Sequence, residues 1–140
     1  MKQSTCILFL AISTFSCIDY EDPVSEFPQT WNIVGWQDFS SGVASEFQPI
    51  RDSIHSYVFK VDGTFLKTIG SETTSGRYKT EIVDYEVIGE RKHYSLIFPD
   101  EKLINSCSKV KEYLFVDGEL LVGGDAACNG TSTYFSLVAK

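Results

Sequence analysis

The sequence predicts an all-β domain, chiefly because two Asp-Gly pairs each lie between short apolar runs. The first pair is in residues 57–66 and the second in residues 113–121. Asp-Gly is a strong hairpin signal because both central residues of a type I′ turn need a positive φ angle, which Gly accepts freely and Asp tolerates. Further strand-like runs follow, and no segment has the length and period of a convincing helix.

The composition fits a single globular domain. The chain has 140 residues, 43% of them hydrophobic and 14% aromatic, which is enough to bury a core. Its formal net charge is −7, and its Lys and Arg residues form no large cluster. Nucleic acids and anionic membrane surfaces attract clustered basic residues, so we expect no nucleic acid as a partner.

Residues 1–16 are typical of a signal peptide. Lys2 precedes an apolar run at 6–15, which has the length of a signal-peptide hydrophobic region and is too short to span a bilayer. The run ends in Ser16-Cys17, which resembles the lipobox of bacterial lipoproteins, where the Cys is acylated and becomes the first residue. Cleavage at the same bond by an ordinary signal peptidase is the alternative.

The number of cysteines favours lipid attachment at Cys17. The chain has four cysteines, and removal of the signal peptide leaves three of them, Cys17, Cys107 and Cys128. An odd thiol in an exported protein calls for an explanation. Acylation of Cys17 supplies one and leaves Cys107 and Cys128 to form a disulfide, which would stabilise the domain by about 3 kcal/mol. The alternative is that Cys6 and Cys17 are simply apolar residues of a membrane-destined segment.

Residues 17–30 are acidic and contain two prolines, which predicts a lipidated tether. They resemble the acidic segment with which some bacteria send lipoproteins to the outer face of the outer membrane. A plain solvated linker is an equally good interpretation. The folded domain is then expected to span residues 31–140.

The domain is predicted to begin with a strand at 31–36 that has apolar residues on both faces. A long irregular loop, Gln37 to Ser53, follows, and loops of this length often determine specificity. Further on, residues 83–87 alternate apolar with acidic side chains, the period of a half-buried strand. The residues expected to share a face in the later strands are Tyr94, Leu96 and Phe98, and then Thr133, Phe135 and Leu137.

A two-residue turn at Asp62-Gly63 predicts which side chains of the first hairpin face inward. The residues assigned to the interior are Tyr57, Phe59, Val61, Thr64, Leu66 and Thr68. Phe65 and Lys67 then fall on the outward face, with the lysine in water. In the second hairpin, the residues expected together on one face are Tyr113, Phe115, Leu120 and Val122.

About eight such strands are joined in sequence order by short turns. Closing them into an eight-stranded antiparallel up-and-down barrel removes both sheet edges, which an open sheet of this apolar content would expose to aggregation. We therefore expect such a barrel with one disulfide. A β-sandwich is the alternative.

Several short motifs in a fixed order carry a family resemblance. They are Trp31-x-x-x-Gly35-Trp36, Phe59-x-x-Asp62-Gly63-Thr64-Phe65, Ser75-Gly76-Arg77-Tyr78 and, towards the end, Cys107, Leu120, Cys128-Asn129-Gly130 and Tyr134. Together they resemble the lipocalin-like domain of small bacterial outer-membrane lipoproteins, over residues 31–140. The resemblance implies a barrel that binds a small apolar ligand in the cell envelope, either in the periplasm or at the cell surface.

The sequence leaves two functions open. In the first, a lipid-anchored barrel binds a small apolar or amphipathic ligand through the aromatic residues Trp31, Tyr57, Phe59, Tyr94 and Phe115. In the second, the barrel is filled and the chain is a protein–protein interaction module, an inhibitor or an accessory subunit, whose acidic surface attracts a basic partner. We recognise no catalytic constellation, metal-ligand spacing or cofactor motif, so we expect no enzyme.

Overall fold

Nine β-strands form the framework of the computed structural model, which describes residues 27–124, 128 and 130–139. In chain order they are β1 (Gln29–Asp38), β2 (Gln48–Pro49), β3 (His55–Phe59), β4 (Thr64–Ile69), β5 (Glu72–Tyr85), β6 (Gly89–Ile97), β7 (Lys111–Asp117), β8 (Leu120–Gly123) and β9 (Thr131–Leu137). Within the described part of the chain, no helix has the length and apolar character needed to cross a membrane.

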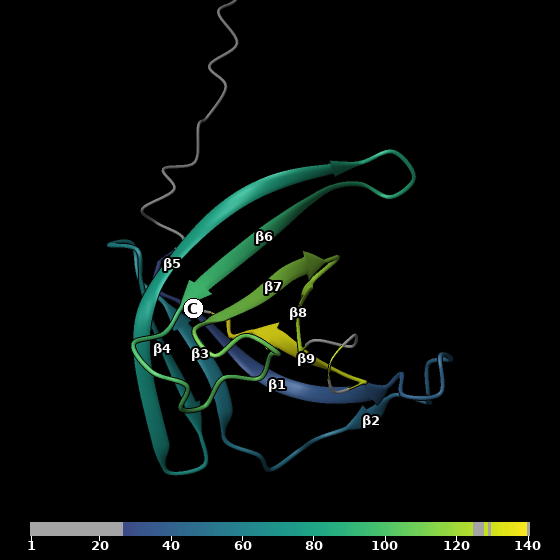
Figure 1. Cartoon of the computed structure of the whole chain (residues 1–140), viewed down its shortest axis with the longest axis horizontal. Helices are drawn as coiled ribbons and strands as arrows, with labels where there is room; N and C mark the ends of the chain where they lie inside the picture. Colours follow the sequence, from purple (N-terminus) through teal and green to yellow (C-terminus); the bar gives the residue numbers. More distant parts are fainter. Residues whose placement is uncertain (1–26, 125–127, 129, 140) are drawn as a thin grey trace, which may run out of the picture.

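Eight of these strands close into an antiparallel barrel (Figure 1). From β3 to β9 each strand pairs with the next in the chain, and β1 pairs with both β3 and β9, which closes the sheet. The short β2 pairs with the far half of β1, at Gly35 and Trp36. The predicted eight-stranded up-and-down barrel is therefore confirmed, and the β-sandwich is wrong.

The first hairpin has a three-residue loop in place of the predicted two-residue turn. The N–H of Gly63 donates to the carbonyl of Lys60 (3.2 Å), and the N–H of Lys60 donates to the carbonyl of Thr64 (2.9 Å). Gly63 has a φ of 79°, so the loop is a type I turn followed by a glycine bulge. The Asp62 carboxylate holds it by accepting from the N–H and the hydroxyl of Thr64, at 2.9 and 2.6 Å.

The extra loop residue shifts the pairing of β3 with β4 by one position. Phe59 pairs with Phe65, and Tyr57 pairs with Lys67. Because side chains alternate across a strand, a one-residue shift exchanges the two faces. Phe65 and Lys67 are therefore fully buried, and the prediction that Leu66 faces the interior while Lys67 lies in water is wrong.

The second hairpin also turns one residue later than predicted. Asp117 pairs with Leu120, so Gly118 and Glu119 are the two loop residues. Gly118 alone of the two has a positive φ, 59°, and a glycine at the first loop position is typical of a type II′ turn.

The later turn leaves the two faces of the second hairpin unchanged, because it alters the pairing by two residues. Leu114 and Leu121 are fully buried in the core, whereas Tyr113 is 59% exposed on the opposite face. Phe115 lies on the same outer face as Tyr113, because the two are separated by two positions on β7. The four residues predicted to share a face therefore do so, because Phe115 pairs with Val122, but the prediction that Phe115 lines the interior is wrong.

β5 and β6 extend beyond the barrel. β4 pairs with β5 only as far as Arg77, and β7 pairs with β6 only from His93 onward. Residues 82–92, here called the arm, pair only with each other. Figure 1 shows the arm projecting past β7 and β8, and the β5–β6 turn lies at its tip.

The predicted disulfide joins Cys107 and Cys128, whose Cα atoms are 5.6 Å apart. It links the segment between β6 and β7 to the segment before β9, at the end of the barrel where β9 begins. The same β6–β7 segment contributes Ile104, which packs against the core. The disulfide thus fastens a segment that helps to cover this end of the barrel.

Candidate functional site

The barrel interior is filled with aromatic side chains. The ring centroid of Phe59 lies 4.6 Å from that of Tyr94 and 4.9 Å from that of Tyr78, and Tyr57 lies 5.0 Å from Phe135. Aromatic rings in direct contact have such separations. Of these five residues, all but Tyr78 are fully buried.

Four of the five predicted ligand-binding residues lie in this packed interior. Trp31, Tyr57, Phe59 and Tyr94 all belong to the core and are at most 5% exposed. Phe115 lies on the outer wall and is not brought together with them. The predicted lipid-attachment residue, Cys17, lies outside the described residues.

A salt bridge is buried among the aromatic rings. The ammonium of Lys67 on β4 lies 3.0 and 2.9 Å from the two carboxylate oxygens of Glu112 on β7, and both side chains are at most 1% exposed. The hydroxyl of Tyr57 donates to the same carboxylate at 2.9 Å. The ammonium also lies 5.0 Å from the centroid of the Tyr57 ring and 5.7 Å from that of Phe98. The network therefore ties β3, β4 and β7 together across the barrel.

Burial governs the electrostatics of this network. Removal from water lowers the pKa of Lys67, and the Glu112 carboxylate opposes that shift. The pKa of the Tyr57 hydroxyl is raised well above its usual value, first by burial and then by the adjacent carboxylate. Tyr57 therefore remains protonated and acts as a hydrogen-bond donor. The arrangement satisfies its own charges and is suited to holding the barrel together.

Neither Lys67 nor Glu112 was among the site residues predicted from the sequence. A signal was present, because Phe65, Lys67 and Ile69 alternate along one strand, and Glu112 alternates with Leu114 in the same way. Each charged residue therefore shares a face with apolar neighbours. That pattern indicates either that the charged side chain lies at the rim of the core, where it reaches solvent, or that two opposite charges are buried as a pair.

His55 lies close to this network and is only half-buried. Its ring packs edge-on against Phe135, with centroids 4.9 Å apart, and lies 5.8 Å from the Tyr57 ring. Burial, together with the Lys67 ammonium, lowers the pKa of His55 to about 4. Its Nε2 atom is buried with no hydrogen-bond partner among the described residues, as is Nε1 of Trp31.

The low pKa of His55 predicts that the domain loses stability as the pH falls from about 6.5 to about 4. In this window the unfolded chain binds a proton at His55 that the folded chain excludes, so the free energy of unfolding decreases. We expect His55 to contribute on the order of 2 kcal/mol to this decrease. Urea unfolding at neutral and at acidic pH measures it, with His55→Gln as the comparison. The carboxylates titrate in both proteins, so an equal loss of stability in the two would contradict the assignment to His55.

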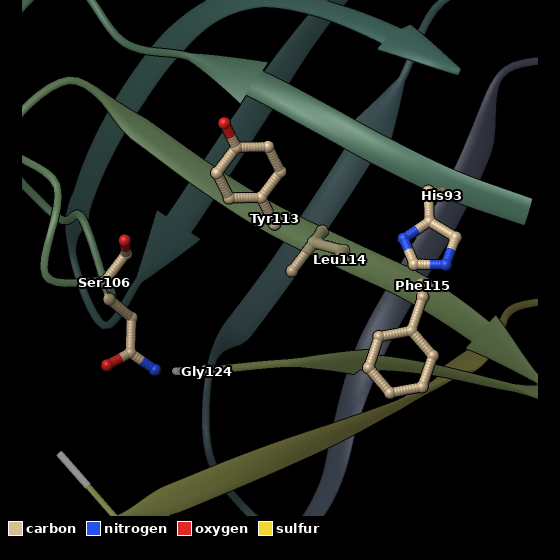
Figure 2. Close-up of a pocket in the computed structure, with 7 residues that line it drawn as sticks. His93, Ser106, Tyr113, Leu114, Phe115 and Gly124 are labelled. Atoms are coloured by element: carbon tan, nitrogen blue, oxygen red, sulfur yellow. The ribbon is translucent and has the colours of Figure 1, made fainter. Parts of the chain in front are cut away.

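A pocket of about 290 Å³ lies on the outer wall, beside β6 and β7 (Figure 2). Its lining residues are His93, Asn105, Ser106, Tyr113, Leu114, Phe115 and Gly124. His93 stacks on Phe115 with ring centroids 5.7 Å apart, and the guanidinium of Arg91 lies 5.1 Å from the same ring. The volume is just below the range of about 300–1,000 Å³ that is usual for ligand pockets. Of the five predicted ligand residues, Phe115 is the one that lines this pocket.

Metal binding finds no support in the described part of the chain, where no group of three or more His, Cys, Asp or Glu side chains is placed to hold an ion. Comparisons of the chain with protein families, with curated proteins and with solved structures gave no match. The interior network and the outer surface are therefore the two features of the structure that bear on function.

Proposed function

We propose that this chain is a lipid-anchored cell-envelope protein whose barrel is an interaction module for another protein, as an inhibitor or an accessory subunit. The aromatic packing and the buried ion pair of the barrel interior support the proposal. A ligand that inserted between β4 and β7 inside the barrel would have to separate Lys67 from Glu112. Leaving one charge of a buried pair without its partner costs about 3–5 kcal/mol, which a small apolar ligand does not repay. Binding is therefore assigned to the outer surface.

The envelope location is supported by the sequence features at the N-terminus. The signal peptide at 1–16, acylation of Cys17 and the tether at 17–30 would fix the domain to the outer membrane. The Cys107–Cys128 disulfide is consistent with this location, because disulfides persist in oxidising compartments such as the bacterial periplasm.

The partner is expected to be a basic protein. The formal net charge of the chain is −7, so its field attracts cationic surfaces and raises the rate of encounter with them. Exposed apolar side chains on the wall and in the loop between β1 and β3, such as Tyr113 and Val43, offer contact area that excludes water.

Photo-crosslinking in the native host tests the proposal. A photoreactive residue at Tyr113 or at Val43 is expected to capture a protein. Native mass spectrometry of the purified chain should then show an acyl mass that is lost in Cys17→Ser, and no small molecule bound. If unfolding released an apolar molecule in stoichiometric amount, the barrel would instead be a ligand carrier. If neither outer position gave a crosslink and no such molecule were released, neither function would hold.

A further inference from the structure

Among the described residues, no strand lies beside one edge of β5 from Thr80 onward. The last backbone hydrogen bond on that side runs from the N–H of Tyr78 to the carbonyl of Gly63, at 2.9 Å. Backbone groups point alternately to the two sides of a strand, so those of Thr80, Ile82 and Asp84 point the same way as those of Tyr78. Among the described residues, no strand pairs with β5 there. These three residues therefore present unpaired donors and acceptors to solvent.

The arm also exposes aliphatic side chains. Ile82 is 61% exposed, and Val87 and Ile88 at the tip are 94% and 52% exposed. A sheet edge with exposed apolar residues is a template for pairing with another chain. Proteins use such edges to bind extended peptides, in which main-chain hydrogen bonds give affinity and side chains give specificity.

The charges of the arm and of Glu81, the residue before it, indicate which kind of partner segment can bind at this edge. Four carboxylates lie here: Glu81, Asp84, Glu86 and Glu90. None of them belongs to a salt bridge within the described residues. The two cations of the arm are directed back to the barrel, because Arg91 bonds Asp117 at 2.8 Å and the Lys92 ammonium lies 5.5 Å from the Tyr94 ring centroid. The free edge is therefore acidic.

We propose that the free edge of β5, at Thr80, Ile82 and Asp84, binds an extended basic segment of a partner protein as an added strand. This inference rests on the proposed function and adds to it the binding surface and the class of partner. Aliphatic residues of the segment pack on Ile82, and its Lys or Arg side chains, which point to the opposite face, meet Glu81. A second copy of the chain fits less well, because pairing two such edges brings carboxylates opposite one another.

A synthetic peptide of alternating Lys and Val, blocked at both ends, is the probe. Added to the full chain, it is expected to slow hydrogen exchange of the Thr80, Ile82 and Asp84 amides, and to bind less tightly as salt is added. A peptide with Glu in place of Lys, and one with a central Pro, are expected to bind roughly tenfold more weakly or worse, because they lose the charge or a main-chain donor.

Two variants separate edge pairing from simple charge attraction. Ile82→Pro removes an N–H that points away from β6, so it blocks the free edge without breaking the β5–β6 pairing. Glu81→Lys keeps the backbone edge and reverses one charge on the face that the lysines of the probe meet. Each is expected to weaken peptide binding by roughly tenfold. Glu119→Lys, at the exposed β7–β8 turn, makes the same charge change elsewhere and should leave binding unaltered.

The outcomes distinguish this inference from the proposed function. Unchanged binding to Ile82→Pro and Glu81→Lys would overturn the inference even if crosslinks from Tyr113 and Val43 succeed. Peptide protection centred on the His93 pocket would also overturn it. If the chain formed a dimer that dissociated in Ile82→Pro, the occupant of the free edge would be a second copy of the chain and not a basic segment of another protein.

Discussion

Replacing Glu112 by Gln is expected to destabilise the domain by about 3–5 kcal/mol. The amide keeps the shape of the side chain and an acceptor for the Tyr57 hydroxyl, so the main loss is the negative charge. The Lys67 ammonium is then left buried without a counter-charge, which is the costly state of a buried pair. Urea unfolding measures the change in the free energy of unfolding.

The double variant Lys67→Met/Glu112→Gln tests the reason for that loss. Removing both charges takes away the unpaired ammonium, so we expect most of the lost stability to return. Glu72→Gln is the matched surface control. It breaks an exposed salt bridge to Lys102 and should cost no more than about 1 kcal/mol. A single Glu112→Gln variant as stable as the Glu72→Gln control would mean that Lys67 carries no buried charge.

The buried pair also shows a limit of prediction from this sequence. Lys67 and Glu112 are 45 positions apart and lie on β4 and β7, which are not neighbours in the sheet. Their contact exists only because the barrel closes, and no local pattern specifies which charges meet across it. Read one at a time, each is a charged residue in a strand, and such residues are mostly solvent-exposed.

Strand positions could be predicted because they depend on local signals, and barrel closure because an open sheet would expose its edges. The Asp62-Gly63 turn and the alternating strand after it were both recognisable. The exact register was not. Gly63 with a positive φ suits a two-residue turn and a three-residue loop alike, and Phe65 and Leu66 offer an apolar residue to either face. At the second hairpin the later turn leaves the faces unchanged, and the error lay in assigning the face that contains Phe115 to the interior.

The register of the first hairpin predicts opposite sensitivities at two adjacent positions. Phe65 is fully buried and its ring centroid lies 4.9 Å from that of Phe98, so Phe65→Ala should cost about 3–5 kcal/mol. Leu66 is half-buried on the outer face, so Leu66→Ala should cost about 1 kcal/mol. The two-residue turn would give the reverse order. Urea unfolding of the two variants measures both changes.

Gly76 on β5 offers an independent check of the same register. It pairs with Phe65, and a Cβ added at Gly76 would meet the Phe65 ring and the carbonyl oxygen of Ile97. Gly76→Ala should therefore destabilise the domain, and Phe65→Leu in the same chain should relieve part of that loss by removing ring atoms. If Leu66→Ala proved more damaging than Phe65→Ala and the Gly76 variant behaved independently of Phe65, the three-residue loop would be wrong. The buried Lys67 would then have to return to solvent, because one residue of register moves both side chains together.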